Sequence, residues 1–448
     1  MGQTPLSPGR QTALGTDPSV PASGWPLPKQ LTFRFFFLFF ILYIFFNPNG
    51  VVPFTEGLFG WYIQPFHQLI PWFGAHILHL SHPITVFTNG SGDTTYDFVI
   101  LLFIFVLSLL GCAVWSALHR HHHAYPTLYY WLSFILRYYI AVTMLSYGLF
   151  KVIKLQFPFP GLSSLLEPYG KSSPMGLAWN FMGYSEGYNY FAGIAETLAG
   201  LLLLFRRTTI AGALLAFVVC SNVMAMNYCF DIPVKLLSTM LVLMSLYLLS
   251  DNFSVIAGFL FKKRVTALKQ PPAPPFKKRS ILIGWTVGKS LFIAFVLIAS
   301  VFQLIDARAS YGDAAPHAAF RGIYDVRSFI RNKDTLPPLV TDTFRWKQLV
   351  IDGSPTYPYA SIRTINDSTK GYYSCKIDSV LHTMKFTSYR DSTDQFIFAY
   401  HQPQNDSLIL SGAWKKDSLE IRLKAYDWKN FLLVRRGFHW INEYPLNR

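Results

Sequence analysis

The chain has 448 residues, of which 51% are hydrophobic, 17% aromatic and only 14% charged. Its mean hydropathy of +0.28 is too high for an ordinary soluble protein and predicts a polytopic membrane protein in contact with the lipid bilayer. The formal net charge of +15 does not indicate a nucleic-acid partner, because the Lys and Arg residues are scattered between apolar runs. The four cysteines have no metal-binding spacing, so we expect no metal site formed by them.

The first 28 residues differ from the apolar runs that follow them. Residues 1–28 are rich in Pro, Gly, Ser and Thr without periodicity, which predicts a disordered cytoplasmic tail and not a signal peptide. Beyond them, seven apolar runs are long enough to cross about 30 Å of hydrocarbon. They cover approximately residues 31–47, 97–118, 127–150, 188–205, 208–228, 233–261 and 280–303.

The positions of Lys and Arg predict the orientation of these spans, since cytoplasmic loops carry the excess of positive charge. Most basic residues flank the spans on one side: Lys29, Arg34, Arg120, Arg206, Arg207, Lys262, Lys263, Arg264, Lys269, Lys277, Lys278 and Arg279. The segment 48–96 on the other side contains no Lys or Arg. We therefore predict a cytoplasmic N-terminus and, because the number of spans is odd, an extracytoplasmic location for everything after Gln303.

The chain divides into a membrane region and a β-rich region. Runs such as "SLILSGAW" and "DSLEIRLKAYD" alternate apolar and polar residues and are separated by turn-forming stretches such as "KKDS". We predict that residues 310–448 form a small extracytoplasmic antiparallel β-barrel or sandwich, with a ligand in the barrel as the less common alternative to a filled interior. Before it we expect two spans with an outer interfacial segment at 51–84, then a four-helix core, then a basic loop with the last span. These parts cover residues 29–126, 127–261 and 262–309.

A few polar side chains lie inside the apolar runs, where an ionisable group is costly unless it is paired or lines a wet cavity. Counting about 1.5 Å per residue from the span ends places Arg137 and Glu196 at similar depth. We predict that these two residues form an intramembrane pair, with Lys289 as the alternative partner and Asn222 as a further polar position. The pair either fixes the register of the helices or belongs to a functional cavity, and both interpretations stay open.

A second polar cluster gathers at the outer ends of the spans. Its members are Tyr147, Lys151, Gln156, Asn227, Asp231 and Lys235, and the aromatic residues Trp179, Tyr184 and Tyr228 lie nearby. Charge beside aromatic rings at this depth predicts a binding site for an anionic or quinone-like head group. The alternative is that the lysines extend to the lipid headgroups while Asp231 pairs with one of them.

Two groups of histidines raise the question of a metal or haem site. The stretch "HRHHH" at 119–123 lies in a predicted cytoplasmic loop, where a solvated basic turn explains it. His76 and His79 would share one helical face, with His67 and His82 nearby. Interfacial histidines beside tryptophan usually lie at headgroup depth, so we predict no metal site.

The stretches "RYYIAVTMLSYGLFKVIKLQFP" and "FAGIAETLAGLLLLFRRTTIAGALLAFVVCSNVMAMNYCFDIPVKLLS" resemble the four-helix membrane core of the DoxX-like family. The resemblance covers a little over a quarter of the chain. It implies a Gly-x-x-Lys motif at Gly148 and Lys151, a Gly-x-x-Glu motif at Gly193 and Glu196, and a last helix entered through Asp231. It further implies a bacterial cytoplasmic (inner) membrane protein, similar to larger DoxX-like proteins, with a quinone-linked redox partner.

Three functional hypotheses follow from these observations. The first is a membrane subunit of a redox complex that uses a quinone near Lys151 and Asp231; no cysteine pair or flavin motif is present for that chemistry to occur in this chain alone. The second is a non-catalytic scaffold that recruits an extracytoplasmic partner through its β-domain. The third is a transporter or lipid-handling protein with Glu196 in its pathway.

Overall fold

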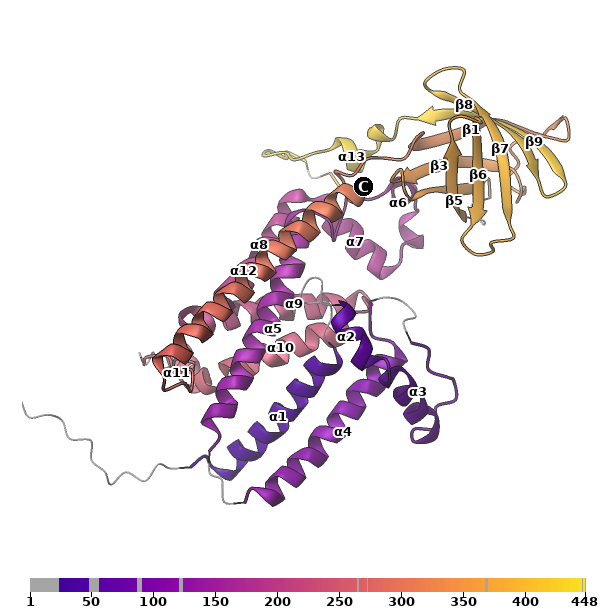
Figure 1. Cartoon of the computed structure of the whole chain (residues 1–448). Coiled ribbons are helices and arrows are strands. Elements are labelled where there is room, and N and C mark those ends of the chain that lie inside the picture. The colour runs from indigo at the N-terminus through magenta and orange to yellow at the C-terminus, as the bar shows by residue number, and fades with distance from the viewer. Residues whose placement is uncertain are drawn as a thin grey trace, which may run out of the picture.

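The computed structural model describes residues 24–47, 56–86, 91–120, 124–263, 266–271, 273–366, 370–444 and 446–447. The tail predicted for residues 1–28 therefore lies almost entirely outside the described residues. A helical bundle forms the first part of the described chain, and a β-barrel follows at one end of it (Figure 1). Helix α1 begins at the opposite end of the bundle (Figure 1).

The helices of the bundle follow the apolar runs closely. They are α1 (Leu27–Phe46), α2 (Glu56–Ile63), α3 (Phe66–His76), α4 (Thr95–Leu118), α5 (Pro126–Val152), α6 (Leu162–Leu165), α7 (Pro174–Tyr184), α8 (Glu186–Leu204), α9 (Thr209–Cys229), α10 (Lys235–Leu249), α11 (Phe253–Lys262) and α12 (Arg279–Ser310). Helices α2 and α3 occupy the segment that sequence placed at the outer interface, and neither is long enough to cross a membrane.

Six helical segments of the described chain are long and apolar enough to cross a membrane. They are Leu27–Phe46, Thr95–Leu118, Pro126–Val152, Arg206–Cys229, Lys235–Lys262 and Arg279–Ser310. Helix α8 corresponds to the fourth predicted span and has 19 residues, with Glu186, Asn189 and Glu196 among them, and it is not one of these six segments. It packs against α5 and α9 in the bundle (Figure 1), while its apolar side chains Phe191, Ile194 and Leu198 are exposed.

The β-rich region forms a closed antiparallel barrel. Its strands are β1 (Gly322–Arg331), β3 (Trp346–Gly353), β4 (Pro358–Thr364), β5 (Lys370–Asp378), β6 (Thr383–Ser388), β7 (Gln395–His401), β8 (Ser407–Trp414) and β9 (Asp417–Tyr426), with the short β2 (Asp334–Thr335) beside β1. Strands β1 and β9 pair from Ile323 with Tyr426 to Arg331 with Leu419 and close the sheet, which leaves no free edge except at β2.

Aromatic side chains fill the interior of the barrel. Trp346, Phe329, Phe386 and Phe398 are fully buried. Along β7 the buried side chains Phe396 and Phe398 alternate with exposed neighbours, as expected for a strand with one face inside. These side chains fill the interior, as in the more common of the two predicted outcomes, and a cavity of about 620 Å³ lies beside them, lined by Trp346, Tyr373 and Trp414.

The barrel rests on the segment between α5 and α8. Leu162 of α6 packs against Ile323 and Val350 of the barrel, and the Asp352 carboxylate accepts a hydrogen bond from the Leu162 backbone N–H at 3.0 Å. Lys154, just after α5, pairs with Asp313, just after α12, at 2.7 Å. The position of the barrel relative to the bundle is therefore fixed by apolar contact and by hydrogen bonds from buried groups.

Candidate functional site

Helices α5 and α8 pack together unusually closely because glycines face each other along their contact. A Cβ atom added at Gly193 would lie 2.7 Å from the carbonyl oxygen of Gly148, and one added at Gly200 would lie 2.8 Å from the carbonyl oxygen of Ala141. Residue numbers rise along α8 as they fall along α5, so the two helices are antiparallel. Small residues at such an interface let helix backbones approach, as they do in membrane proteins generally.

This glycine contact brings Lys151 of α5 to Glu196 of α8. The Lys151 ammonium donates a hydrogen bond to Glu196 Oε1, and the two form an ion pair. Both side chains are buried, with 5% and 6% of their surfaces exposed. Lys151 follows Gly148 by three residues and Glu196 follows Gly193 by three residues, which is about 4.5 Å along each helix. The long Lys151 and Glu196 side chains span the distance that remains between the two backbones.

The structure contradicts the predicted pair of Arg137 and Glu196. Arg137 instead donates hydrogen bonds to the carbonyl oxygens of Leu203 and Leu204 at the end of α8, at 3.0 and 3.3 Å. Glu196 lies seven residues, or about 10 Å, further along the same helix. Depths counted from the helix ends do not determine this pairing, because the glycine contact sets the register of α5 against α8.

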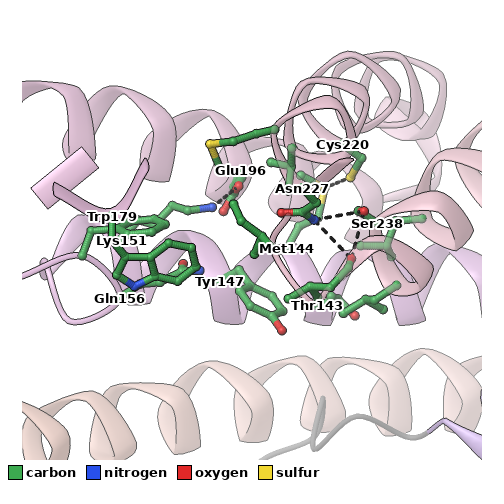
Figure 2. A pocket seen from close by; sticks show the side chains of 17 residues that line it. Thr143, Met144, Tyr147, Lys151, Gln156, Trp179, Glu196, Cys220, Asn227 and Ser238 are labelled. Atoms are coloured by element: carbon green, nitrogen blue, oxygen red, sulfur yellow. Dashed lines mark hydrogen bonds and ion pairs between the residues drawn. The ribbon is translucent and has the colours of Figure 1, made fainter. Parts of the chain in front are cut away.

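A cavity of about 80 Å³ lies beside the Lys151–Glu196 pair. Its walls come from α5, α7, α8, α9, α10, the segment after α5 and the segment between α9 and α10, and Figure 2 shows the side chains that line it. They are mainly apolar, and the residues with polar or sulfur-containing side chains are Thr143, Met144, Tyr147, Lys151, Gln156, Trp179, Glu196, Cys220, Met226, Asn227 and Ser238. In Figure 2 the Lys151 side chain runs beside Trp179 towards Glu196, while Tyr147 points away from the ion pair.

Two acceptor atoms of this cavity have no donor in the described residues. Glu196 Oε2 and Gln156 Oε1 are both buried and make no hydrogen bond, although buried polar atoms are usually satisfied. The Asn227 amide nitrogen, by contrast, has two acceptors, because it donates to the Val234 carbonyl and the Ser238 hydroxyl, both at 3.1 Å. The cavity therefore combines a cationic donor, a carboxylate with a free oxygen and apolar walls, which suits a small ligand that has both carbonyl and hydroxyl character.

Of the six residues predicted for the outer cluster, Tyr147, Lys151, Gln156 and Asn227 line this cavity, and Asp231 and Lys235 do not. Lys235 pairs with the exposed Asp231 at 2.9 Å. Its backbone N–H donates to the Asp93 carboxylate at 2.6 Å, so this group stabilises the start of α10. The structure therefore shows the alternative predicted for Asp231, in which its carboxylate pairs with a lysine.

The remaining polar positions lie away from the cavity. Asn222 is exposed on α9 and Lys289 is partly exposed on α12, and neither lines the site. Lys289 does not pair with Glu196 either, since Lys151 occupies that position.

The histidines of the described residues do not assemble into a ligand set. Helix α3 ends at His76, so His79 does not share its helical face as the spacing predicted. His76 stacks on Trp72 with ring centroids 5.1 Å apart. Residues 121–123 of the histidine tract lie outside the described residues, and within the described part no three His, Cys, Asp or Glu side chains come together in a way that could hold a metal ion.

Several cavity residues were missed by the sequence analysis, among them Thr143, Met144, Cys220 and Ser238. A helical spacing of four connects Thr143, Tyr147 and Lys151 on one face of α5, and that signal was available. Cys220 and Ser238 enter the site only through the packing of α9 and α10 on α5, which no local pattern reveals.

Over 113 residues the chain is 41% identical to "Uncharacterized protein YwoB" of Bacillus subtilis (strain 168), a match that covers 25% of this chain and 71% of the relative. This chain belongs to the family of that Bacillus protein. No family model and no solved structure matches the chain. The name of this relative states no activity, and the resemblance to the DoxX-like family stays a prediction.

Proposed function

We propose that this protein is the membrane subunit of a quinone-linked redox complex and that the cavity beside Lys151 and Glu196 binds the quinone head group. The observation that carries the proposal is a buried ion pair, with one carboxylate oxygen unpaired, in the wall of a mainly apolar cavity. An ionisable pair in this position within a membrane protein is costly, and such groups commonly mark a ligand or proton pathway.

The residues present fit a quinone. One water molecule needs a cavity volume of about 10–15 Å³. The cavity of about 80 Å³ is several times larger and suits a single six-membered ring. The Lys151 ammonium would donate to a carbonyl oxygen, and Glu196 Oε2 would accept from a hydroxyl of the reduced form. A bound quinone supplies two-electron redox chemistry, and the electrons would come from a partner subunit. Trp179 and Phe157, whose rings lie 5.1 Å apart, would keep water from the ring.

The test is to count quinone in the full-length protein. Protein purified from its native membranes in mild detergent is extracted, and quinone per chain is measured by mass spectrometry. We expect close to one quinone per chain in the wild type, and less than a tenth of that in Glu196→Gln and Lys151→Met. Lys235→Gln is the matched control, because Lys235 is a nearby lysine in an ion pair that does not line the cavity. Absence of quinone from the wild type, or equal retention in all four proteins, would contradict the proposal.

The proposed orientation places the N-terminus in the cytoplasm and the barrel outside. It requires α8 to cross as a seventh span, and its 19 residues are about 28 Å long, close to the hydrocarbon thickness. The start of α1 and the barrel lie at opposite ends of the bundle (Figure 1), and this supports an odd number of crossings. The excess of Lys and Arg in the loops at the α1 end supports the direction.

A second candidate function is a scaffold that recruits an extracytoplasmic partner. It is favoured by the C-terminal segment beyond the barrel, where Phe438, Trp440, Ile441 and Tyr444 are 77%, 91%, 75% and 89% exposed. A photo-crosslinking residue at position 440 would capture such a partner as one discrete band. The same residue at Val380, an equally exposed apolar position of the barrel (86%), is the control. Identical products from both positions would argue against a specific surface.

A further inference from the structure

Arg137 is a buried cation without a carboxylate partner. Its side chain lies inside the bundle and the residue is 7% exposed. Nε and Nη2 donate to the Leu203 and Leu204 carbonyl oxygens, but no ion pair includes Arg137 in the described part of the chain. The carbonyl end of a helix carries only about half a negative charge, so these contacts balance the guanidinium incompletely.

Arg137 lines a second cavity, of about 160 Å³, at the opposite end of α5 from the Lys151–Glu196 pair. Its polar lining includes Ser133, Thr209, Asn252, Asp251 and Lys269. Nη1 of Arg137 donates to no described group. A volume of this size holds roughly ten waters, which is enough for a tetrahedral oxyanion and its immediate substituents.

One wall of this cavity is a segment of the loop between α11 and α12 that folds back on the helices. Asn252 holds the segment by two hydrogen bonds with the Lys269 backbone, at 2.8 and 3.2 Å. Arg206 holds it from the other side by donating to the Pro271 carbonyl oxygen at 2.9 and 2.6 Å. These hydrogen bonds hold the loop segment against the cavity, and the segment contributes a second cationic residue, Lys269, to the lining.

The charges around the cavity leave an excess of positive charge. The single carboxylate of the lining, Asp251, already pairs with Lys29 at 3.0 Å and accepts a hydrogen bond from the Tyr129 hydroxyl at 2.7 Å. Lys269, like Arg137, makes no ion pair within 4 Å among the described residues, although its charge acts on the Asp251 carboxylate that Lys29 already holds. Arg137 and Lys269 both line this small cavity together with hydroxyl and amide side chains, and guanidinium and ammonium groups are those that bind phosphate.

We propose that this cavity is a binding site for a phosphate-type oxyanion, with Arg137 and Lys269 as its two cationic ligands. The anion would be either the headgroup of an acidic phospholipid or free phosphate. The position of the cavity at the basic end of the spans suits a lipid headgroup, because juxtamembrane Lys and Arg attract anionic lipids. The site is separate from the proposed quinone cavity and shares no lining residue with it.

The test uses the full-length protein in a neutral detergent and native mass spectrometry with three probes: phosphatidylglycerol, phosphatidylcholine and inorganic phosphate. The variants are Lys269→Gln and Arg137→Gln. The matched control is Lys277→Gln, because Lys277 is an exposed lysine of the same loop that does not line the cavity. Lys269 is itself exposed and is held through its backbone, so its variant is expected to fold even where Arg137→Gln does not.

We expect one tightly bound phosphate group per chain in the wild type and in Lys277→Gln, and at least tenfold weaker binding in Lys269→Gln. Binding of phosphatidylglycerol but not of inorganic phosphate identifies a lipid headgroup, and binding of inorganic phosphate identifies the free ion; either supports the site. The proposal is overturned if neither probe binds better than phosphatidylcholine, or if Lys277→Gln weakens binding as much as Lys269→Gln does.

Discussion

Breaking the Lys151–Glu196 pair should cost more than removing it. Both side chains are nearly fully buried, and loss of one partner from a buried pair costs about 3–5 kcal/mol because the other charge is left uncompensated. Glu196→Gln and Lys151→Met preserve volume closely, so the double variant removes both charges with little new cavity. We expect each single variant to lose about 3 kcal/mol and the double variant to lose less than the sum, with a coupling of about 1–3 kcal/mol.

Thermal unfolding of the full-length protein in detergent, followed by intrinsic fluorescence, measures this coupling. A loss of about 3 kcal/mol corresponds to a fall in Tm of roughly 6–12 °C for a domain of 150–250 residues. The control cycle combines Glu196→Gln with Arg137→Gln. Arg137 lies opposite Leu203, about 10 Å from Glu196 along α8, so these two losses should add. Additive losses in the first cycle, or strong coupling in the second, would refute the assignment of Lys151 as the partner of Glu196.

Three further predictions concern packing, pH and topology. Gly193→Ala should destabilise the protein by about 1–3 kcal/mol, because the new Cβ would lie 2.7 Å from the Gly148 carbonyl oxygen. Gly288→Ala is the control and should not destabilise the protein, because no atom lies within 4 Å of a Cβ added there. Equal melting temperatures of the two variants would contradict this prediction. Burial raises the pKa of the Cys375 thiol from 9.0 to about 12. The raised pKa favours the neutral thiol in the folded state, so this stability is present below pH 9 and is lost as pH rises towards 12, by at most about 4 kcal/mol. Cys375→Ala should flatten the alkaline part of the stability profile, and an unchanged profile would count against the buried thiol as its cause. A reporter active only in the cytoplasm, fused after residue 448, should be silent, and a strong signal would mean that α8 does not cross.

The features predicted correctly from sequence are those with a local signature. Runs of apolar residues predict α1, α4, α5, α9 and α12, because each residue that contacts the hydrocarbon of a membrane has to be apolar. The strands of the barrel were predicted for the same reason, since period-two alternation is written into each strand separately, as in β7. The barrel closes by pairing of β1 with β9, which lie almost a hundred residues apart in the sequence. The alternation of apolar and polar residues within one strand does not predict which strand it pairs with.

The site was predicted only in part, because it depends on the register between helices. Tyr147, Lys151 and Gln156 could be placed together from their positions near the end of one span. Glu196 was assigned to the wrong cation because its depth was counted from a helix end. The motif Gly193 to Glu196 was recognised, but the sequence does not state that Gly193 meets Gly148, and that contact determines which side chain of α5 faces the carboxylate.

The contact between α5 and α8 also explains why a buried cation lies at each end of α5. Once Gly148 faces Gly193 and Ala141 faces Gly200, Arg137 necessarily lies beside Leu203, where α8 ends and exposes its carbonyl oxygens. Lys151 lies at the other end of the same contact, where α8 offers a carboxylate instead. Lys151 therefore has a full counter-charge within the protein, whereas Arg137 has only the partial charge of a helix terminus. A substitution that shifts this register, such as Gly193→Ala, is therefore expected to weaken ligand binding in both cavities together, whereas Lys269→Gln should affect only the cavity at the Arg137 end.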